Sequence, residues 1–252
     1  MTADTSTDLT VHENVYGRQL SEVYDQLYRG RGKDFADEAA KLARVVKERD
    51  PGADSLLDVA CGTAEHLRYL RREFTDTAGL ELSPQMRAIA TAKLPGVPIH
   101  DGDMRDFDVG RTFDAVCCLY STIGYMSTVE ELGSSIAAMT RHVPRGGVVV
   151  VEPWWFPERF LDGYVGEAVV REGDRTVVRV SHSVRIDQVV RQEAHFVVAD
   201  PMGIRHFVNV QVLTLFTEEE YRAAFDRAGC AVDFVTGDRC WSERGLFVGV
   251  RR

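Results

Sequence analysis

Hydrophobic positions follow two spacings along most of the chain, and these spacings predict its elements. Apolar residues recur at helical spacing in 16–28, 34–47, 64–73, 84–94 and 128–142. Short apolar runs predict strands near 55–60, 77–82, 97–100, 113–119 and 147–152. Runs that are apolar throughout, such as Val148–Val151, are typical of a parallel sheet with helices on both faces. The pattern therefore predicts an α/β fold.

The pattern changes in residues 164–216. Polar and apolar residues alternate over 177–184, 191–198 and 206–214, as they do in half-exposed strands. We therefore expect three or four antiparallel strands in this region. After it, Thr217 and Glu220 predict a capped helix that ends at Gly229. Strands near 231–236 and 245–250 then complete the first sheet.

These elements predict one domain with an insertion. Residues 13–163 and 217–252 are expected to form a seven-stranded, mostly parallel, doubly wound sheet of Rossmann-like type. Residues 164–216 would add an inserted antiparallel β layer. Residues 1–12 are polar, rich in Thr and Asp, and are expected to be a disordered tail.

Composition narrows the classes of protein. The chain has 252 residues, 44% of them hydrophobic, which supports a substantial core. A net charge of −9 argues against a general nucleic-acid surface. The chain has no apolar run of 18 residues, and its five cysteines form no CxxC pair, so we expect a cytoplasmic protein with neither a membrane span nor a disulfide framework. His182 and His195 share no ligand spacing with a carboxylate or cysteine, so no metal site is expected.

Candidate chemistry lies at the ends of the first three predicted strands. Small residues at 60–64, among them Gly62, leave the backbone open to a ligand. Glu81 ends the second strand, where its carboxylate would accept hydrogen bonds from ribose hydroxyls. Asp103 follows the third strand and would bind an adenine amino group, while Met104 packs on the ring. These features predict a pocket for an adenosine-containing cofactor.

The same segment favours S-adenosylmethionine over a dinucleotide. Dinucleotide binding is associated with three glycines in the pattern G-x-G-x-x-G. Aligned on the turn, those positions are Ala60, Gly62 and Glu65. A glutamate is a poor fit where a helix must pack closely on a strand.

Leu57–Thr63 together with Glu81 resembles the class I S-adenosylmethionine-dependent methyltransferases. A narrower resemblance covers nearly the whole chain, to the dTDP-3-amino-sugar N,N-dimethyltransferases of the desosamine and mycaminose pathways. It is carried by segments 24–25, 32–35, 101–107, 149–158, 180–185 and 244–249. The most specific strings are Pro-Trp-Trp-Phe-Pro at 153–157 and Arg-Val-Ser-His-Ser at 179–183.

The resemblance implies S-adenosylmethionine as cofactor, two successive methyl transfers to the amine of a dTDP-linked sugar, and a homodimer. The β layer would supply substrate and dimer contacts. The cofactor-binding candidates, completed by the neighbouring motif residues Gly62 and Leu82, are Tyr24, Ala60, Gly62, Glu81, Leu82, Asp103, Met104 and Leu119.

Substrate-binding candidates come partly from the resemblance and partly from the charge that a diphosphate needs. The resemblance implies Tyr16, Trp155 and Arg244, with the strand from Arg179 to Ser183 nearby. Cationic candidates for the diphosphate are Lys33, Arg179, Arg185, Arg205 and Arg244, and Arg244 is preferred. Trp154 and Trp155 would form a wall beside the sugar. The full set of substrate candidates is Tyr16, Lys33, Glu152, Trp154, Trp155, Arg179, Ser181 and Arg244.

Tyr16 and Tyr125 are the catalytic candidates. Some members of the resembling family carry His where this chain has Tyr125, and a tyrosine is a base near pH 7 only if its pKa is strongly lowered. Other departures are Ala64 in place of glycine, Phe35 in place of tyrosine, and the stretch at Arg239–Trp241. Methyl transfer to a neutral amine needs positioning more than a strong base.

Two other functions stay open at this stage. One is methylation of another small-molecule acceptor, such as a hydroxyl group. The other is a non-catalytic S-adenosylmethionine-binding protein. The sequence also leaves open whether the amine is at C3 or C4 of the sugar, and whether one or two methyl groups are added.

Overall fold

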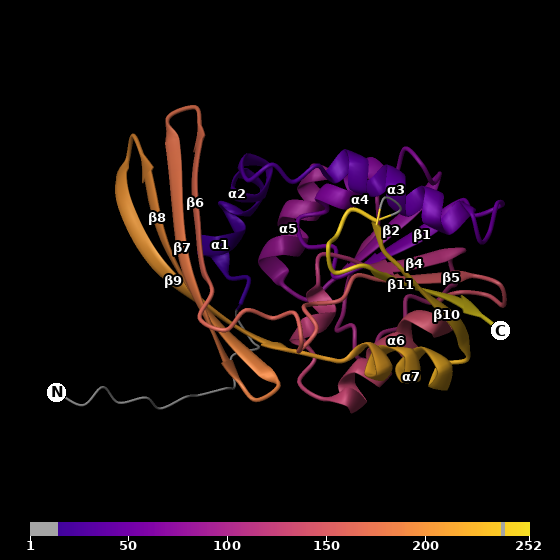
Figure 1. Ribbon diagram of the computed structural model, residues 1–252. Helices are drawn as coiled ribbons and strands as arrows, with labels where there is room; N and C mark the ends of the chain where they lie inside the picture. The colour runs from indigo at the N-terminus through magenta and orange to yellow at the C-terminus, as the bar shows by residue number, and fades with distance from the viewer. Residues whose placement is uncertain (1–14, 238–239) are drawn as a thin grey trace.

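A twisted sheet of seven strands forms the centre of the larger lobe (Figure 1). The computed structural model describes residues 15–237 and 240–252, so the tail predicted for 1–12 lies outside the described residues. The strand order is β10-β11-β5-β4-β1-β2-β3, and of these strands only β11 runs against the others. The strands are β1 (Ser55–Val59), β2 (Asp76–Glu81), β3 (Ile99–Asp101), β4 (Ala115–Cys118), β5 (Val148–Val151), β10 (Cys230–Val235) and β11 (Leu246–Arg251). The predicted mostly parallel, seven-stranded sheet is confirmed.

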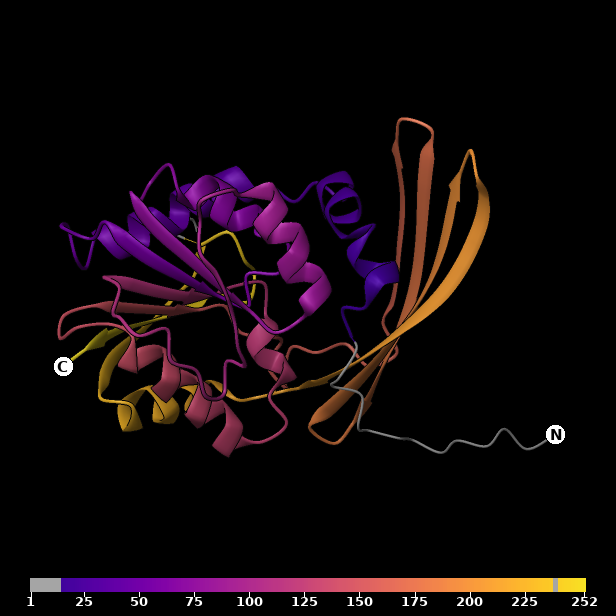
Figure 2. The same ribbon diagram turned by 180° about the vertical axis from the view of Figure 1, so that it is seen from behind.

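Helices cover both faces of this sheet (Figures 1 and 2). One face carries α3 (Phe35–Lys47), α4 (Glu65–Leu70) and α5 (Pro84–Lys93), and the other carries α6 (Val129–Arg141) and α7 (Glu218–Arg227). Cys117 belongs to the buried cluster under the first group of helices, and Cys118 to the cluster under the second. The two neighbouring cysteines therefore point to opposite faces of β4, because successive side chains alternate along a strand.

The second sheet is an antiparallel β layer that stands beside the larger lobe (Figure 1). Its strands pair in chain order and are β6 (Val165–Glu172), β7 (Arg175–Ile186), β8 (Val189–Asp200) and β9 (Gly203–Thr214). The inserted antiparallel layer is therefore confirmed, with four strands. The alternating runs in the sequence indicated β7, β8 and β9, whereas β6 is short and its pattern is interrupted by Gly166.

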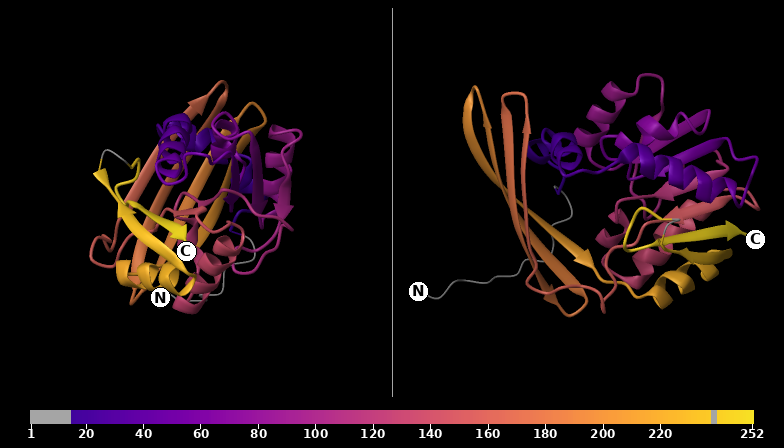
Figure 3. Two further views of the ribbon diagram at one scale, coloured as in Figure 1. Left: turned by 90° about the vertical axis from the view of Figure 1, so that its right-hand side faces the viewer. Right: turned by 45° about the horizontal axis from the view of Figure 1, so that its top comes forward.

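Two short helices lie between the β layer and the larger lobe (Figure 3). They are α1 (Arg18–Ser21) and α2 (Tyr24–Gly30), where the sequence predicted one helix over 16–28. The amide of Val23 bonds to the carbonyl of Leu20 at 3.1 Å, in a tight turn that separates the two helices. Val23 is fully buried and packs with Leu27 in the core under the β layer. The break between α1 and α2 thus allows Val23 and Leu27 to lie in the same core under the β layer.

α2 packs very closely on the β layer. A Cβ atom on Gly30 would lie 2.1 Å from Cγ1 of Val170, so a glycine is required for this approach. One turn earlier, Nε2 of Gln26 donates a hydrogen bond to the carbonyl of Arg175 at 3.3 Å. The helix is therefore held against both β6 and β7.

In the part of the chain that the structure describes, none of the helices has the length and apolar character that crossing a lipid bilayer requires.

Candidate active site

A cavity of about 440 Å³ opens at the carboxyl ends of β1, β2 and β3. This is the edge of a parallel sheet where ligands bind in doubly wound folds. Seven of the eight cofactor candidates line it: Tyr24, Ala60, Gly62, Glu81, Leu82, Asp103 and Met104. The eighth, Leu119, lines an adjoining cavity of about 30 Å³, which shares Tyr24 and Ala60 with the first. The structure thus brings all eight candidates together.

The backbone after β1 has an unusual conformation. Ala60, Gly62 and Ala64 have φ values of 58°, 57° and 62°, in the left-handed region. Glu81 holds this loop, because its Oε2 atom accepts a hydrogen bond from the amide of Gly62 at 2.8 Å. Its Oε1 atom accepts from the amide of Ser83 at 2.7 Å. Glu81 therefore joins the tip of β2 to the loop after β1.

Burial raises the pKa of Glu81, although the two backbone amides partly offset that effect. The carboxylate is only 6% exposed and lines the cavity. It can accept further hydrogen bonds, because each carboxylate oxygen has more than one lone pair.

Asp103 and Met104 occupy the third strand tip. Met104 is buried and lines the cavity, as its predicted packing role requires. Asp103 accepts hydrogen bonds from the amide and side chain of Arg105, and the closest ion-pair distance is 2.5 Å. Arg105 also contacts Glu131 at 2.9 Å. Asp103 is therefore oriented by an arginine at the edge of the cavity.

The sequence reasoning missed two acidic side chains beside the small cavity. Asp58 and Glu65 line it, and in the described part of the chain neither Oδ2 of Asp58 nor Oε2 of Glu65 has a hydrogen-bond partner. Burial raises the pKa of Asp58 from 3.8 to about 6. The sequence could have indicated a role for Asp58, because it is a carboxylate within an otherwise apolar strand. Buried carboxylates that face a small cavity fit an ammonium group.

The other carboxylate oxygen of Glu65, Oε1, takes part in a network that connects α2 to the loop after β1. Lys93 lies 2.6 Å from Oε1 of Glu65 and 2.6 Å from Oδ2 of Asp25 on α2. The other oxygen of Asp25 accepts a short hydrogen bond from the hydroxyl of Thr63. This network fixes the helix that carries Tyr24 relative to the loop after β1.

The two catalytic candidates meet at the large cavity. The hydroxyl oxygens of Tyr16 and Tyr125 lie 2.9 Å apart, and both residues line the cavity. Burial raises the pKa of each phenol, as it does for Tyr24. Ring contacts extend from Tyr16 to Tyr24, and from Tyr24 to Tyr28. Tyr16 and Tyr125 are therefore neutral near pH 7, so they can hold a ligand by hydrogen bonds but are poor bases.

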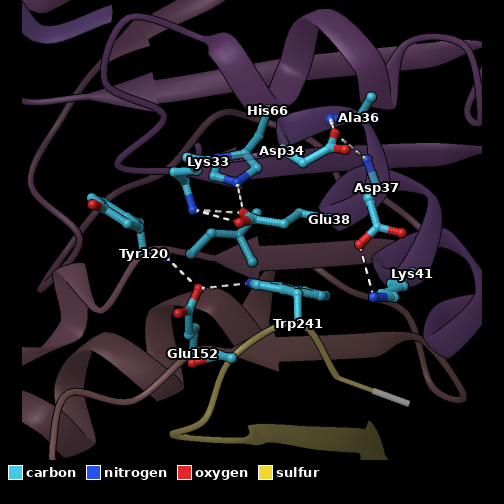
Figure 4. Close-up of polar contacts among 12 residues, drawn as sticks. Lys33, Asp34, Ala36, Asp37, Glu38, Lys41, His66, Tyr120, Glu152 and Trp241 are labelled. Atoms are coloured by element: carbon cyan, nitrogen blue, oxygen red, sulfur yellow. Dashed lines mark hydrogen bonds and ion pairs between the residues drawn. The ribbon is translucent and has the colours of Figure 1, made fainter. Parts of the chain in front are cut away.

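Arg244, the preferred diphosphate candidate, is already paired. Its Nη2 atom lies 2.7 Å from Oε1 of Glu152, a side chain that is 1% exposed. Oε2 of Glu152 accepts hydrogen bonds from the amide of Tyr120 at 2.8 Å and the indole of Trp241 at 3.3 Å (Figure 4). The guanidinium group also stacks near the indole rings of Trp154 and Trp155, with its carbon 5.7 and 5.4 Å from the ring centres. Arg244 therefore neutralises a buried acid and orders the tryptophan wall.

Lys33 is also neutralised. Its ammonium group lies 2.6 Å from Oε2 of Glu38, which in turn lies 2.7 Å from Nε2 of His66 (Figure 4). The same ammonium group lies over the ring of Tyr120, 4.1 Å from its centre. His66 lines the small cavity, so this buried cluster supports one wall of it.

The remaining candidates lie on the β layer. The guanidinium group of Arg179 bonds to the hydroxyl of Ser181 at 2.8 Å and to Oε1 of Gln192 at 3.1 Å. Arg205 pairs with Asp200 at 2.9 Å, and Arg185 donates to the carbonyl of Pro157 at 2.7 Å. Arg179 is thus bound only to neutral groups, whereas Arg205 has an acidic partner.

A polar stripe on the inner face of the β layer was also missed. Gln192 is directly opposite Gln211, whose side chain bonds to Asn209 at 3.1 Å. Together with Arg179, Ser181 and Ser183 these residues share the face that carries the apolar core under α2. The signal was the alternation itself, because Gln192, Asn209 and Gln211 fall in the inward phase of their strands.

The site therefore has three groups of candidates. The cofactor candidates, Tyr16 and Tyr125 surround the large and small cavities. Glu152, Trp154, Trp155 and Arg244 form a second group, and Arg179 and Ser181 a third. Tyr120 connects the first two groups, since it lines the small cavity and its amide donates a hydrogen bond to Glu152. Within the described residues, no group of three or more His, Cys, Asp or Glu side chains is arranged to hold a metal ion.

Comparisons with known proteins agree with this geometry. Residues 56–147 match the methyltransferase domain family. The chain is 55% identical, over 94% of its length and 99% of the relative, to the dTDP-3-amino-3,4,6-trideoxy-alpha-D-glucopyranose N,N-dimethyltransferase of Streptomyces venezuelae. It is 47% identical, over 94% of its length and 95% of the relative, to the dTDP-4-amino-2,3,4,6-tetradeoxy-D-glucose N,N-dimethyltransferase of Saccharopolyspora spinosa.

A solved structure is similar over the whole fold. S-adenosylmethionine-bound CalS10, an amino pentose methyltransferase from Micromonospora echinaspora, superposes with a TM-score of 0.84 at 51% identity. The match covers 96% of this chain and 100% of that one. The fold and the strand-tip cavity define an S-adenosylmethionine-dependent methyltransferase. Within that class, the near full-length similarity shows that the chain belongs to the dTDP-amino-sugar N,N-dimethyltransferase family.

The buried Asp58 predicts a pH dependence of stability without ligand. The pKa of Asp58 in the folded protein, about 6, is above its ordinary value of 3.8, so the fold favours the protonated carboxyl. This contribution to stability is complete below about pH 4 and is lost as pH rises through about 6. The loss amounts to about 3 kcal/mol at most. Asp58→Asn should therefore remove this fall in the free energy of unfolding, measured by urea titration between pH 4 and 7. The exposed Asp174→Asn should keep it, and equal slopes for Asp58→Asn and wild type would contradict the assignment.

Proposed function

We propose that this enzyme transfers methyl groups from S-adenosylmethionine to the amino group of a dTDP-linked deoxyaminosugar, giving the N,N-dimethyl product in an antibiotic-sugar pathway. The observation that carries this proposal is the pair of neutral tyrosine hydroxyls, Tyr16 and Tyr125, at a cavity of nucleoside size. Near full-length similarity to enzymes named for dTDP-3-amino and dTDP-4-amino sugars supports the same class of substrate.

The cavities fit S-adenosylmethionine by the chemistry of their walls. Glu81 would accept hydrogen bonds from the ribose hydroxyls, and Asp103 and Met104 would contact the adenine. Asp58 and Glu65 would face the ammonium group, because both residues line the small cavity and each has, among the described residues, one buried oxygen without a hydrogen-bond partner. Ala60 and Leu119 would lie along the amino-acid end. When bound, this cofactor supplies a methyl group that is activated by a positively charged sulfur.

The tyrosines would hold the acceptor amine in place. A neutral amine carries the lone pair that methylation needs, and the phenol oxygens can accept its N–H bonds. Because the pKa values of Tyr16 and Tyr125 are raised, neither phenol has to lose its proton. Their rings also offer faces to a cation, and methyl transfer leaves the positive charge on the amine nitrogen. Positioning is therefore the main contribution of these residues.

Glu152, Trp154, Trp155 and Arg244 would form the wall beside the sugar, and Lys33 would support the opposite wall through Glu38 and Tyr120. All five cysteines are buried and free, which supports a cytoplasmic location, where thiols stay reduced.

A turnover assay tests the function. Purified enzyme is incubated with S-adenosylmethionine and a panel of dTDP-3-amino and dTDP-4-amino sugars, and the products are measured by mass spectrometry. We expect at least one amino sugar to gain two methyl groups, with an equivalent amount of S-adenosylhomocysteine. Turnover of hydroxyl acceptors alone would support an O-methyltransferase. A lack of S-adenosylhomocysteine with every acceptor would support a binding protein.

Replacing the tyrosine hydroxyls should slow the enzyme without abolishing it. Tyr16→Phe and Tyr125→Phe each remove one neutral hydrogen bond, so we expect about a 10-fold loss in kcat/KM from each. The double variant should lose less than the product of the two, because the hydroxyls bond to each other. The remote Tyr69→Phe is the control. A loss of about 10⁴-fold in either single variant would indicate true acid–base chemistry instead.

We also propose that the enzyme is a homodimer that associates through the outer face of the β layer. Val165, Val169, Val180 and Val208 lie on this face and are 45–73% exposed. Exposed apolar patches of this kind often mark protein contacts. Light scattering should give the mass of two chains for wild type and of one chain for Val169→Glu/Val180→Glu. Leu161→Glu, an exposed change outside the sheet, should stay dimeric, and a monomeric wild type would contradict the proposal.

A further inference from the structure

Two histidines lie side by side on the outer face of the β layer. His195 on β8 and His206 on β9 adjoin Phe196 and Phe207, whose rings stack in the core under α2. Because successive side chains alternate along a strand, the histidines point away from that core, and both are exposed. Nδ1 of His195 lies 3.2 Å from Nε2 of His206. The pair thus connects β8 to β9, which is an edge strand of the layer (Figure 1).

An acidic side chain orients His195. Oε1 of Glu193 lies 2.9 Å from Nε2 of His195, the ring nitrogen that does not face His206. The hydrogen bond with His195, followed by the contact with Arg191 at 2.8 Å, lowers the pKa of Glu193, so its carboxyl group is ionised near pH 7. A carboxylate only accepts hydrogen bonds, and neutral His195 therefore donates to it from Nε2. This tautomer leaves the lone pair of Nδ1 facing His206.

The spacing of the two ring nitrogens fits a metal ion. Imidazole nitrogens bind Zn²⁺ at about 2.0–2.1 Å, so two of them 3.2 Å apart subtend an angle of about 100° at the ion, close to the tetrahedral value. A histidine that binds a metal commonly donates its second ring N–H to a carboxylate, as His195 does to Glu193. The same spacing also fits a plain hydrogen bond between the two rings, and a metal titration separates the two cases.

We propose that His195 and His206 form a clip for one divalent transition-metal ion of the Zn²⁺, Ni²⁺ and Cu²⁺ class, with Glu193 supporting the first ligand. Imidazole nitrogens suit these ions, whereas Mg²⁺ and Ca²⁺ prefer oxygen ligands. In the segments that the structure describes, no group of three or more His, Cys, Asp or Glu side chains could hold a metal ion, so water completes the coordination. The sequence could not show that His206 lies beside His195 on the neighbouring strand.

The clip is separate from the site of methyl transfer. Neither histidine lines the large or the small cavity, so the proposal does not rest on the proposed function. His195 is paired with Val180 on β7 and with Val208 on β9, two exposed valines of the face that we propose for the homodimer. Both ligands come from one chain, so a single chain suffices to bind the ion. A bound ion would stabilise the folded protein by mass action.

Calorimetry on untagged, full-length enzyme tests the clip after metal has been removed by chelation and dialysis. Zn²⁺, Ni²⁺ and Cu²⁺ chlorides are titrated separately, and we expect one ion per chain, with Cu²⁺ bound most tightly. His195→Gln and His206→Gln should each lose about 100-fold or more in affinity, because losing a supporting partner alone costs about 10- to 100-fold. The affinity of wild type should also fall as the pH is lowered from about 7.5 to about 5.5, because a protonated imidazole cannot bind a metal.

Matched variants separate the clip from general effects. His100→Gln removes a histidine on β3, in the larger lobe, and should bind the ions as wild type does. Glu193→Gln keeps an acceptor for His195 but loses the charge, so we expect a smaller loss of about 10-fold. The electron paramagnetic resonance spectrum of bound Cu²⁺ should show two imidazole nitrogens in wild type. The two ligand histidines are exposed, so their variants should fold, and circular dichroism checks this.

The outcomes decide the proposal without any assay of methyl transfer. Equal affinity in wild type and in both ligand variants would overturn the clip, and so would a wild type that binds none of the three ions. Light scattering with and without metal should give the same mass. A mass that doubles only when metal is present would show that two copies share the ion, and would overturn the single-chain clip. A wild type that is monomeric and still binds one ion would contradict the proposed dimer and support the clip.

Discussion

The structure depends on the close packing of α2 between two separate sheets. At Gly30 the helix approaches the β layer so closely that no side chain fits. On its opposite side, Asp25 binds Lys93 and Thr63, next to the cofactor loop. A helix of seven residues is not stable alone, so these contacts determine its position. Because Tyr24 and Tyr28 lie on this helix, its packing also fixes the tyrosine that lines the large cavity and the ring that packs against it.

Charge is distributed unevenly around the site, and this follows from what each part has to bind. Near the cofactor, Asp58, Glu65 and Glu81 are buried acids, and the cofactor that fits them carries positive charge on its sulfur and its ammonium group. On the other side of the tyrosines, the cations gather around Tyr120. A chain with a net charge of −9 has no general attraction for a diphosphate, so any cations that bind one must be local.

Much of the fold could be predicted from the hydrophobic pattern, because buried parallel strands and alternating exposed strands have distinct spacings. The strand tips followed from it, and so did the cofactor candidates, since Glu81 ends β2 and Asp103 follows β3 at the same edge of the sheet. The hydrophobic pattern could not predict which charged side chains pair with one another in the fold. Arg244 and Lys33 resembled free cations in the sequence, yet both are neutralised by acids. Arg244 pairs with Glu152 from another part of the fold, and Lys33 pairs with Glu38 in the helix that follows it. The break between α1 and α2 also depends on burial of Val23 under a sheet encoded 150 residues later, which helical spacing alone does not reveal.

The Glu152–Arg244 pair shows how a buried ion pair can orient the side chains around it. Glu152 is nearly inaccessible, so its charge has to be matched by donors inside the protein. Tyr120 supplies one donor from the segment after β4, and Trp241 and Arg244 supply the others from the connection between β10 and β11. A largely buried ion pair adds little net stability, but it restricts the geometry of the side chains that contact it. Trp154 and Trp155 lie against that guanidinium group. The pair therefore sets the shape of the wall that Trp154 and Trp155 form.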